Sequence, residues 1–294
     1  MPSLAARWTS ACLRRCVKPH LAGLIRFAQR AQALGDRLPR FAALATRPTR
    51  LGGLAGEWID AATNAPVATL FYLHGGGYVV GAPGLYRSVL RGFARQGFTV
   101  FAPAYRLAPR HPFPAAMDDA HAAFLALRRD TDGPIVIAGD SAGGGLALAL
   151  MARLRDEGVA LPKAAALFSP WTDLAVTGAS TRDNEQRDPL FSRRLVQIGA
   201  RVYLGRASSK NPLASPLYAE LCGLPPLLVQ VGADELLRDD STRVVERALA
   251  AGVSAEVRLW PGAPHGWQMA TLFMPEARAA QREAAAFLLR HARG

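Results

Sequence analysis

The chain has 294 residues, half of them hydrophobic and one fifth charged, which is typical of a globular enzyme with one large domain and a modest accessory segment. Its net charge of +12 comes almost entirely from arginine, but the arginines are dispersed and no basic run is interleaved with aromatics, so we expect no nucleic-acid partner. With no apolar stretch of about 18 residues and no signal-peptide pattern, we expect no stable membrane insertion and a cytoplasmic location.

The three cysteines give no sign of a disulfide framework or a zinc site. They are odd in number, and their spacing matches no metal-binding pattern. They are Cys12, Cys16 and Cys222. We therefore expect neither a bound metal nor a disulfide.

Residues 1–48 are predicted to form an N-terminal helical segment. Apolar residues recur there at helical spacing, from Leu21 to Ala31, and Gly35 and Pro39 provide stop signals. From residue 49 the hydrophobic pattern of the sequence changes to short apolar runs. The prediction is a helical cap segment over 1–48 followed by a catalytic domain over 49–294.

Short apolar runs alternate with helical stretches through the rest of the chain. This alternation predicts an α/β fold with a doubly wound, mostly parallel sheet. The predicted strands are 57–59, 67–73, 98–102, 134–138, 163–168, 226–231 and 255–260. The predicted helices are 85–96, 115–129, 142–157, 240–251 and 276–291.

One interval, 174–222, is far longer than a single crossover helix needs. It contains an arginine-rich helical candidate at about 190–204 and then a loop with two prolines. An insertion of this size between two strands predicts a lid over the carboxyl ends of the sheet. We further expect its apolar helical face to pack on the N-terminal segment, so that the two form one cap.

The main chemical signal is Gly-Asp-Ser-Ala-Gly-Gly at 139–144, which lies directly after a strand and directly before a helix. This is the G-x-S-x-G pattern in the context that it requires, where a sharp turn exposes the serine hydroxyl at a helix N-terminus. The pattern predicts that Ser141 is a nucleophile.

A second signal is His-Gly-Gly-Gly at 74–77, directly after the strand at 67–73. Glycines allow the backbone to approach a ligand closely, and acyl transfer needs backbone amides that bind an oxyanion. Together with the residue after the nucleophile, this loop predicts an oxyanion hole made by Gly76, Gly77 and Ala142. His74 is interpreted as an orienting loop histidine rather than a base.

The acid and the histidine should follow the serine in that chain order. His265 comes after the strand at 255–260, and an acidic group comes after the strand at 226–231. Both would lie at the edge where open α/β sheets bind ligands. Four residues of the second group are candidates for the acid: Asp234, Glu235, Asp239 and Asp240. Asp239 and Asp240 are better explained as helix N-caps.

These motifs together resemble the hormone-sensitive-lipase-like family of esterases. The resemblance continues through AYRLAPRHPFPAAMDDA at 104–120, SPWTDL at 169–174, LPPLLVQVGADELLRDD at 224–240 and PHGWQ at 264–268. It departs at Arg110, where the family usually has glutamate, and at Glu235, where proline usually follows the acid.

The resemblance implies an α/β-hydrolase fold with an eight-stranded sheet and a helical cap. It also implies Ser141, Asp234 and His265 as a catalytic triad that hydrolyses small ester molecules, or lactones, with short to medium acyl chains. No cofactor is expected. Two alternatives stay open, an amidase or peptidase and a non-catalytic binding module on the same fold, and so does assembly into a homodimer.

Overall fold

The computed structural model describes residues 2–35, 47–63 and 65–293. Eight strands form one sheet in the order β1-β2-β4-β3-β5-β6-β7-β8, in which the six strands from β4 to β8 are parallel and the two at the β1 edge are antiparallel. The strands are β1 (Arg47–Leu51), β2 (Leu54–Ile59), β3 (Ala68–Leu73), β4 (Phe98–Pro103), β5 (Ile135–Asp140), β6 (Ala165–Phe168), β7 (Leu227–Gly232) and β8 (Ala255–Trp260). The predicted eight-stranded, mostly parallel sheet is confirmed.

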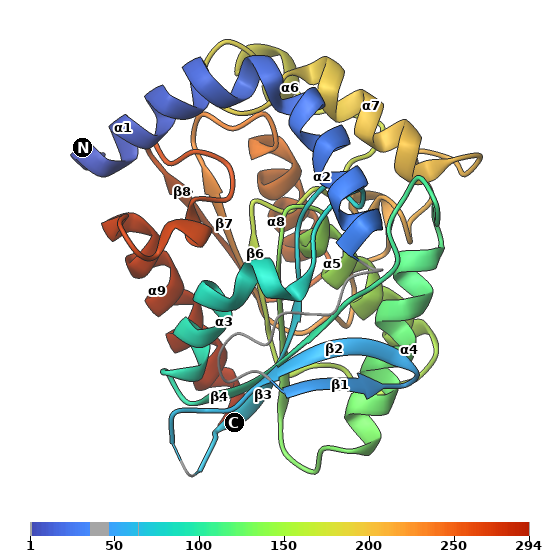
Figure 1. Cartoon of the computed structure of the whole chain (residues 1–294). Helices are drawn as coiled ribbons and strands as arrows, with labels where there is room; N and C mark the ends of the chain where they lie inside the picture. The colour runs from blue at the N-terminus through green and yellow to red at the C-terminus, as the bar shows by residue number, and fades with distance from the viewer. Residues whose placement is uncertain (1, 36–46, 64, 294) are drawn as a thin grey trace.

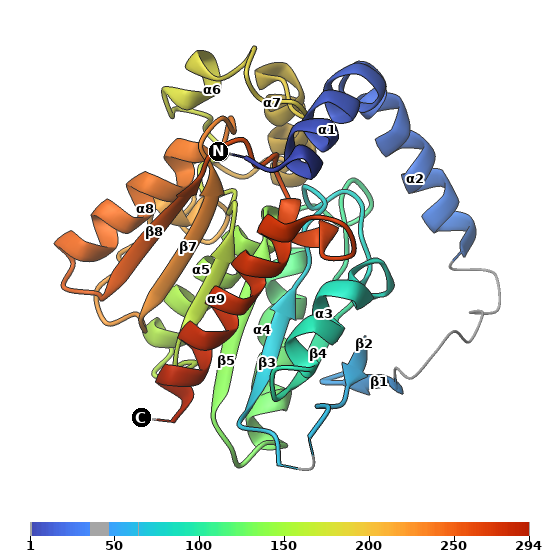
Figure 2. The same cartoon turned by 90° about the vertical axis from the view of Figure 1, so that its left-hand side faces the viewer.

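Helices cover both faces of this sheet (Figures 1 and 2). One face is packed by α4 (Ala115–Arg129), α5 (Ala142–Asp156) and α8 (Arg238–Ala250), and the other by α3 (Arg87–Ala94) and α9 (Pro275–Ala292). Alternate residues of one strand serve opposite layers: Phe71 and Leu73 pack toward α4 and α5, whereas Leu70 and Tyr72 pack toward α3 and α9. This is the arrangement expected of strands that read as continuous apolar runs.

The remaining helices lie beyond one end of the sheet. They belong to the two parts of the predicted cap. The N-terminal segment forms α1 (Leu4–Cys12) and α2 (Leu21–Gly35), which are joined by a π-helical turn (Leu13–Val17) and a 3-10 turn (Lys18–His20). The insertion forms α6 (Ser180–Asp183) and α7 (Arg193–Leu204). Figures 1 and 2 both show these two groups side by side above the strands. Segments far apart in sequence therefore meet at one end of the sheet.

The predicted helical segment 1–48 needs a correction at its end. β1 begins at Arg47 and pairs with β2, so the last two residues of that segment belong to the sheet, and residues 36–46 lie outside the described residues. β2 lies second from this edge of the sheet, between β1 and β4, and only Gly56 and Ile59 of its residues are fully buried. None of the described helices is both long enough and apolar enough to cross a bilayer.

Candidate active site

Ser141 occupies the sharp turn between β5 and α5. Its backbone angles, φ 52° and ψ −121°, are strained for a residue with a side chain, at a cost of about 1–3 kcal/mol. The surrounding backbone holds this conformation: the Ser141 amide donates to the Phe168 carbonyl at 2.8 Å, and the Ser141 carbonyl accepts from the amides of Gly145 and Trp171. The predicted strand–turn–helix context of the serine is therefore present.

The glycine at position 143 allows the start of α5 to lie against the end of β3. A Cβ at Gly143 would come within 2.1 Å of the Leu73 carbonyl oxygen and 2.4 Å of that of His74. Backbone atoms cannot move away from such a contact, so any side chain at position 143 would push the turn at Ser141 away from the loop that follows β3. The glycine of the motif thus fixes the distance between two parts of the site.

That loop carries the residues predicted to bind an oxyanion. Gly76 has φ 114°, a conformation that favours glycine, and its carbonyl accepts from the amides of Val79 and Val80 at 3.1 Å. Gly76 and Gly77 line the same cavity as Ser141, and Ala142 is the first residue of α5, where backbone amides lack intrahelical acceptors. All three predicted residues thus lie at the turn or at the cavity it faces.

Asp140, directly before Ser141, connects this loop to the turn. Its carboxylate accepts from the Gly75 amide at 2.9 Å and from the hydroxyls of Tyr72 and Tyr86 at 3.0 and 3.1 Å. Burial raises the pKa of Asp140 to about 6, although these three hydrogen bonds oppose the shift. Asp140 had no predicted role, although its place inside the motif, directly before Ser141, was an available signal.

His265 is held by Glu235 and not by Asp234. Its Nδ1 donates to Glu235 Oε2 at 2.6 Å, and both side chains are almost fully buried. The predicted contact between Asp234 and His265 is therefore wrong. Asp234 points instead to Arg187 of the insertion, with which it forms an ion pair at 2.5 Å, partly exposed to solvent.

The Glu235 carboxylate is fixed on its other side as well. Oε1 accepts from the Ser169 hydroxyl at 2.7 Å and from the Gly232 amide at 2.6 Å, which leaves Oε2 for the imidazole. The departure from the family pattern was the signal for Glu235, because a glutamate at a position usually taken by proline supplies a second carboxylate next to the expected one.

Two opposed effects act on the pKa of His265. Burial lowers it, but the charge of Glu235 and its hydrogen bond, with smaller contributions from Asp188 and Asp140, raise the pKa above its usual value. The same ring packs edge-on against Phe191, with 4.7 Å between ring centroids. Glu235 thus favours the protonated form of the His265 imidazole.

Ser141 and His265 open on one cavity of about 600 Å³. Its walls are mainly apolar and come from α2, from the loop after β3 and from α7. Residues of the two cap helices that line it include Leu21, Ile25, Gln29, Leu195, Ile198 and Val202. An apolar cavity with a few convergent polar groups is the usual form of a small-molecule site.

His74 is buried and stacked on Tyr105, with 4.2 Å between ring centroids. Its Nδ1 donates to the Gly75 carbonyl at 2.8 Å, and burial lowers its pKa to about 4. The ring is absent from the lining of the cavity that holds Ser141. This arrangement fits the interpretation of His74 as a loop-orienting residue.

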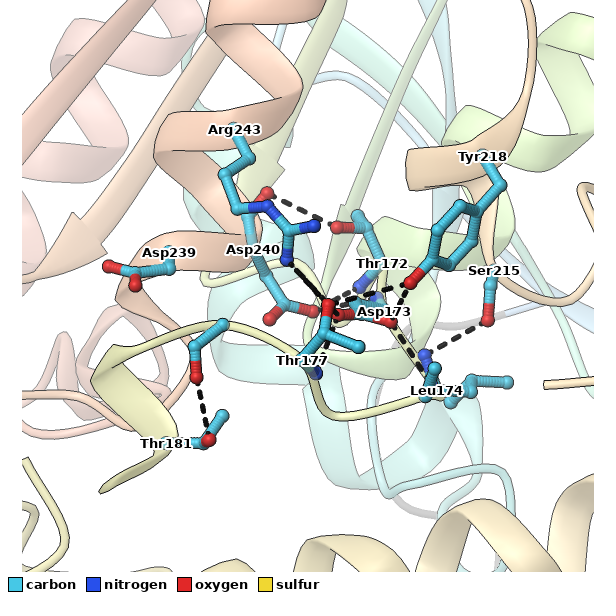
Figure 3. A network of polar contacts seen from close by, with 12 residues as sticks. Thr172, Asp173, Leu174, Thr177, Thr181, Ser215, Tyr218, Asp239, Asp240 and Arg243 are labelled. Atoms are coloured by element: carbon cyan, nitrogen blue, oxygen red, sulfur yellow. Dashed lines mark hydrogen bonds and ion pairs between the residues drawn. The ribbon is translucent and has the colours of Figure 1, made fainter. Parts of the chain in front are cut away.

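Asp239 and Asp240 are not N-caps, so that interpretation is wrong. α8 begins at Arg238, which places both aspartates inside its first turn. Asp239 accepts from the amide of Ser180, and Asp240 accepts from the amides of Thr172 and Asp173 at 2.8 Å each. Both carboxylates therefore hold the start of the insertion against α8, and Figure 3 shows Asp240 beside Thr172 and Asp173.

Asp240 and Asp173 form a buried acidic pair within this network (Figure 3). Burial, and then the charge of Asp173, raise the pKa of Asp240 to about 8. Burial also acts to raise the pKa of Asp173, but hydrogen bonds from Thr177, Tyr218 and Arg243 outweigh it and lower that pKa. Asp240 is therefore the member of the pair that holds a proton at neutral pH.

Asp240→Asn is expected to be tolerated and Asp240→Ala to be destabilising. Asparagine resembles the protonated carboxyl and keeps an acceptor for both amides, whereas alanine leaves two buried N–H groups unpaired, at about 2–5 kcal/mol in the free energy of unfolding. Urea unfolding at neutral pH measures the difference, with Glu246→Ala, an exposed acid on α8, as the control.

The pH dependence of the same variants gives a second check. A carboxyl with a raised pKa in the folded state favours folding below the unfolded pKa, and that contribution is lost as the pH rises toward about 8. The wild type should therefore lose stability relative to Asp240→Asn between about pH 5 and pH 9. A constant difference over this range would show that Asp240 is ionised throughout.

Comparison with known proteins shows the family. The sequence profile of a family described as having the alpha/beta hydrolase fold matches residues 70–269. An acetyl-hydrolase of Streptomyces hygroscopicus is 41% identical over 241 residues, covering 81% of this chain and 80% of the relative. A carboxylesterase/phospholipase of Mycobacterium tuberculosis, LipF, is 34% identical over 313 residues, covering 98% of this chain and 82% of the relative.

Solved structures give the same result over nearly the whole chain. The crystal structure of EstE5 is 33% identical and superposes with a TM-score of 0.90, covering 99% of this chain and 100% of EstE5. An esterase of the bacterial hormone-sensitive lipase family is 38% identical, with a TM-score of 0.87 and 99% of both chains covered. The chain therefore belongs to the α/β-hydrolase family, among the serine esterases related to hormone-sensitive lipase.

Proposed function

We propose that the chain hydrolyses carboxylic esters through a triad of Ser141, His265 and Glu235. The observation that carries this assignment is the hydrogen bond between Glu235 and His265 Nδ1, made by a histidine that lines the same cavity as the strained serine. With Nδ1 committed to the carboxylate, Nε2 is the nitrogen that accepts the serine proton.

The reaction then follows two steps. As the Ser141 oxygen attacks the ester carbonyl, its proton passes to His265, and Glu235 stabilises the imidazolium. The alcohol leaves with that proton, and water, activated by the same histidine, releases the acid from the acyl-serine. The amides of Gly76, Gly77 and Ala142 are proposed to bind the oxyanion in both steps, since each lies at the nucleophile turn or the cavity it faces.

The N-terminal helices and the 174–222 insertion are proposed to act as one cap. Supporting this, α2 and α7 both line the cavity, and Gln29 of α2 donates to the Val79 carbonyl in the loop after β3. The cap would then set which acyl groups reach Ser141. Lactones are small cyclic esters and are proposed as substrates on the same grounds.

Short acyl chains are the expected substrates. A cavity of about 600 Å³ with apolar walls favours acyl groups of about two to eight carbons. A panel of p-nitrophenyl esters from about two to sixteen carbons, with lactones beside it, measures the preference as kcat/KM. Faster turnover of an emulsified long-chain lipid than of a soluble butyrate ester would contradict the proposal.

A variant of the cap gives this test a control. Leu195 lines the cavity from α7, whereas its neighbour Arg194 is exposed. Leu195→Trp should shorten the preferred acyl chain by filling the cavity, and Arg194→Trp should leave the profile as in the wild type. Equal profiles for the two variants would show that α7 does not bound the acyl site.

A further inference from the structure

Asp188 lies in the part of the insertion between α6 and α7, and its side chain is fully buried. Three backbone amides share its carboxylate. Oδ1 accepts from the amides of Leu190 and Phe191 at 2.7 and 2.8 Å, and Oδ2 accepts from the amide of Leu236 at 2.7 Å. A buried carboxylate held in this way joins two segments that are distant in sequence.

The two segments carry two side chains that contact His265. Leu236 directly follows Glu235, whose carboxylate holds His265 Nδ1, and Phe191 packs its ring edge-on against the imidazole. One oxygen of Asp188 thus fixes the backbone of Phe191, and the other fixes the backbone of Leu236, next to Glu235. The same segment of the insertion also reaches the acid loop through Asn184, whose amide donates to the Glu235 carbonyl at 2.9 Å.

The N-terminal helical segment holds the other side of this part of the insertion. Lys18 Nζ donates to the carbonyls of Glu185 and Asp188 at 2.9 and 2.7 Å. The guanidinium of Arg14 donates to the carbonyls of Gln186 and Arg187. The four consecutive carbonyls of residues 185–188 therefore accept hydrogen bonds from two cationic side chains that lie one helical turn apart.

The first helix also reaches the loop before His265. The Ser10 hydroxyl donates to the Gly262 carbonyl at 3.3 Å, and Ser3 is hydrogen-bonded to Glu276 through both its amide and its hydroxyl. The cap thus contacts the loops of both the acid and the histidine.

We propose that Asp188 is a positioning residue of the hydrolytic reaction, which fixes Glu235 and Phe191 around His265 from within the cap, and that Lys18 holds Asp188 in place. The proposal rests on the triad of Ser141, His265 and Glu235 given above. Under it, the cap does more than enclose the substrate, since it completes the support of the base.

Asp188→Asn tests the proposal directly. The amide can accept for only one of the two segments, so the acid loop or Phe191 is released. We expect kcat to fall about 10- to 100-fold while KM changes less than about threefold, because misplacement of the base affects the chemical step more than binding. The control is Asp183→Asn, which removes an exposed acid from the same part of the insertion.

The pH profile separates positioning from a merely structural role. The charge of Asp188 helps to raise the pKa of His265, so the acid limb of the kcat/KM profile should move to lower pH in Asp188→Asn. Titration of active sites with an organophosphate makes kcat independent of the fraction folded. An unshifted acid limb with kcat per site equal to that of Asp183→Asn would overturn the proposal.

Lys18→Met keeps the proposal testable even where Asp188→Asn fails to fold. It removes the ammonium donors and retains the apolar stem, and Arg15→Met, an exposed residue on the same segment, is its matched control. We expect Lys18→Met to lower kcat about 3- to 10-fold with little change in KM, and its effect to be non-additive with Asp188→Asn. Activity equal to that of Arg15→Met would overturn the role of Lys18.

Failure of the triad and failure of this proposal give different results. A wild-type protein that neither hydrolyses p-nitrophenyl butyrate nor reacts with the organophosphate at Ser141 would contradict both the triad and the positioning role of Asp188. An active wild type that loses activity on Glu235→Gln but not on Asp188→Asn or Lys18→Met would keep the triad and remove only the positioning role.

Discussion

Replacing Ser141 with alanine is expected to lower kcat for p-nitrophenyl butyrate by about six orders of magnitude. No other group at the turn can form the acyl intermediate, so only the background supplied by the oxyanion amides and binding would persist. The fold should be retained, because the contacts that hold the turn are made by the backbone of Ser141 rather than by its hydroxyl.

Mass spectrometry of the intact chain provides the second measurement. The wild type should gain the mass of an acyl or phosphoryl group on incubation with a slow ester or an organophosphate, and Ser141→Ala should gain none. Ser254→Ala, which removes an exposed serine before β8, is the control and should behave as the wild type. A Ser141→Ala protein that retains more than a few per cent of activity would refute the nucleophile assignment.

Glu235→Gln is expected to lower kcat by about 10⁴. Oε1 already accepts from Ser169 and Gly232, so the carbonyl oxygen of glutamine must remain there and its NH₂ group must face His265. An amide that donates to Nδ1 selects the tautomer with the proton on Nε2, which cannot accept the proton of Ser141. The imidazolium also loses its counter-charge.

Asp234→Asn is the matched variant, since it makes the same chemical change one residue earlier. Among the described residues Asp234 forms an ion pair with Arg187, whose side chain is 64% exposed, and such pairs contribute about 0–1 kcal/mol to stability. Turnover should therefore change by less than about threefold. Steady-state kinetics of both variants decide the matter, and a large loss in Asp234→Asn with none in Glu235→Gln would return the acid to Asp234.

The sequence alone was sufficient for the fold, and it singled out the serine and the histidine that we propose as nucleophile and base. Apolar runs and helical periods report burial along one element, and each strand from β3 to β8 lies within two residues of its predicted start. The motif around Ser141 is equally local, because strand, turn and helix are contiguous. His265 followed from chain order and from its place after the last strand.

Only the tertiary structure decided between neighbouring carboxylates. Asp234 and Glu235 are adjacent in a tight turn, where successive side chains leave in different directions, and no periodicity tells which one faces inward. The choice is made by groups far away in sequence, since Ser169 receives Glu235 and Arg187 receives Asp234. Asp240 was misjudged for the same reason, because its amide partners lie about seventy residues earlier. Hydrogen bonds that join distant segments leave no local pattern in the sequence, and they determine which carboxylate is hydrogen-bonded to His265.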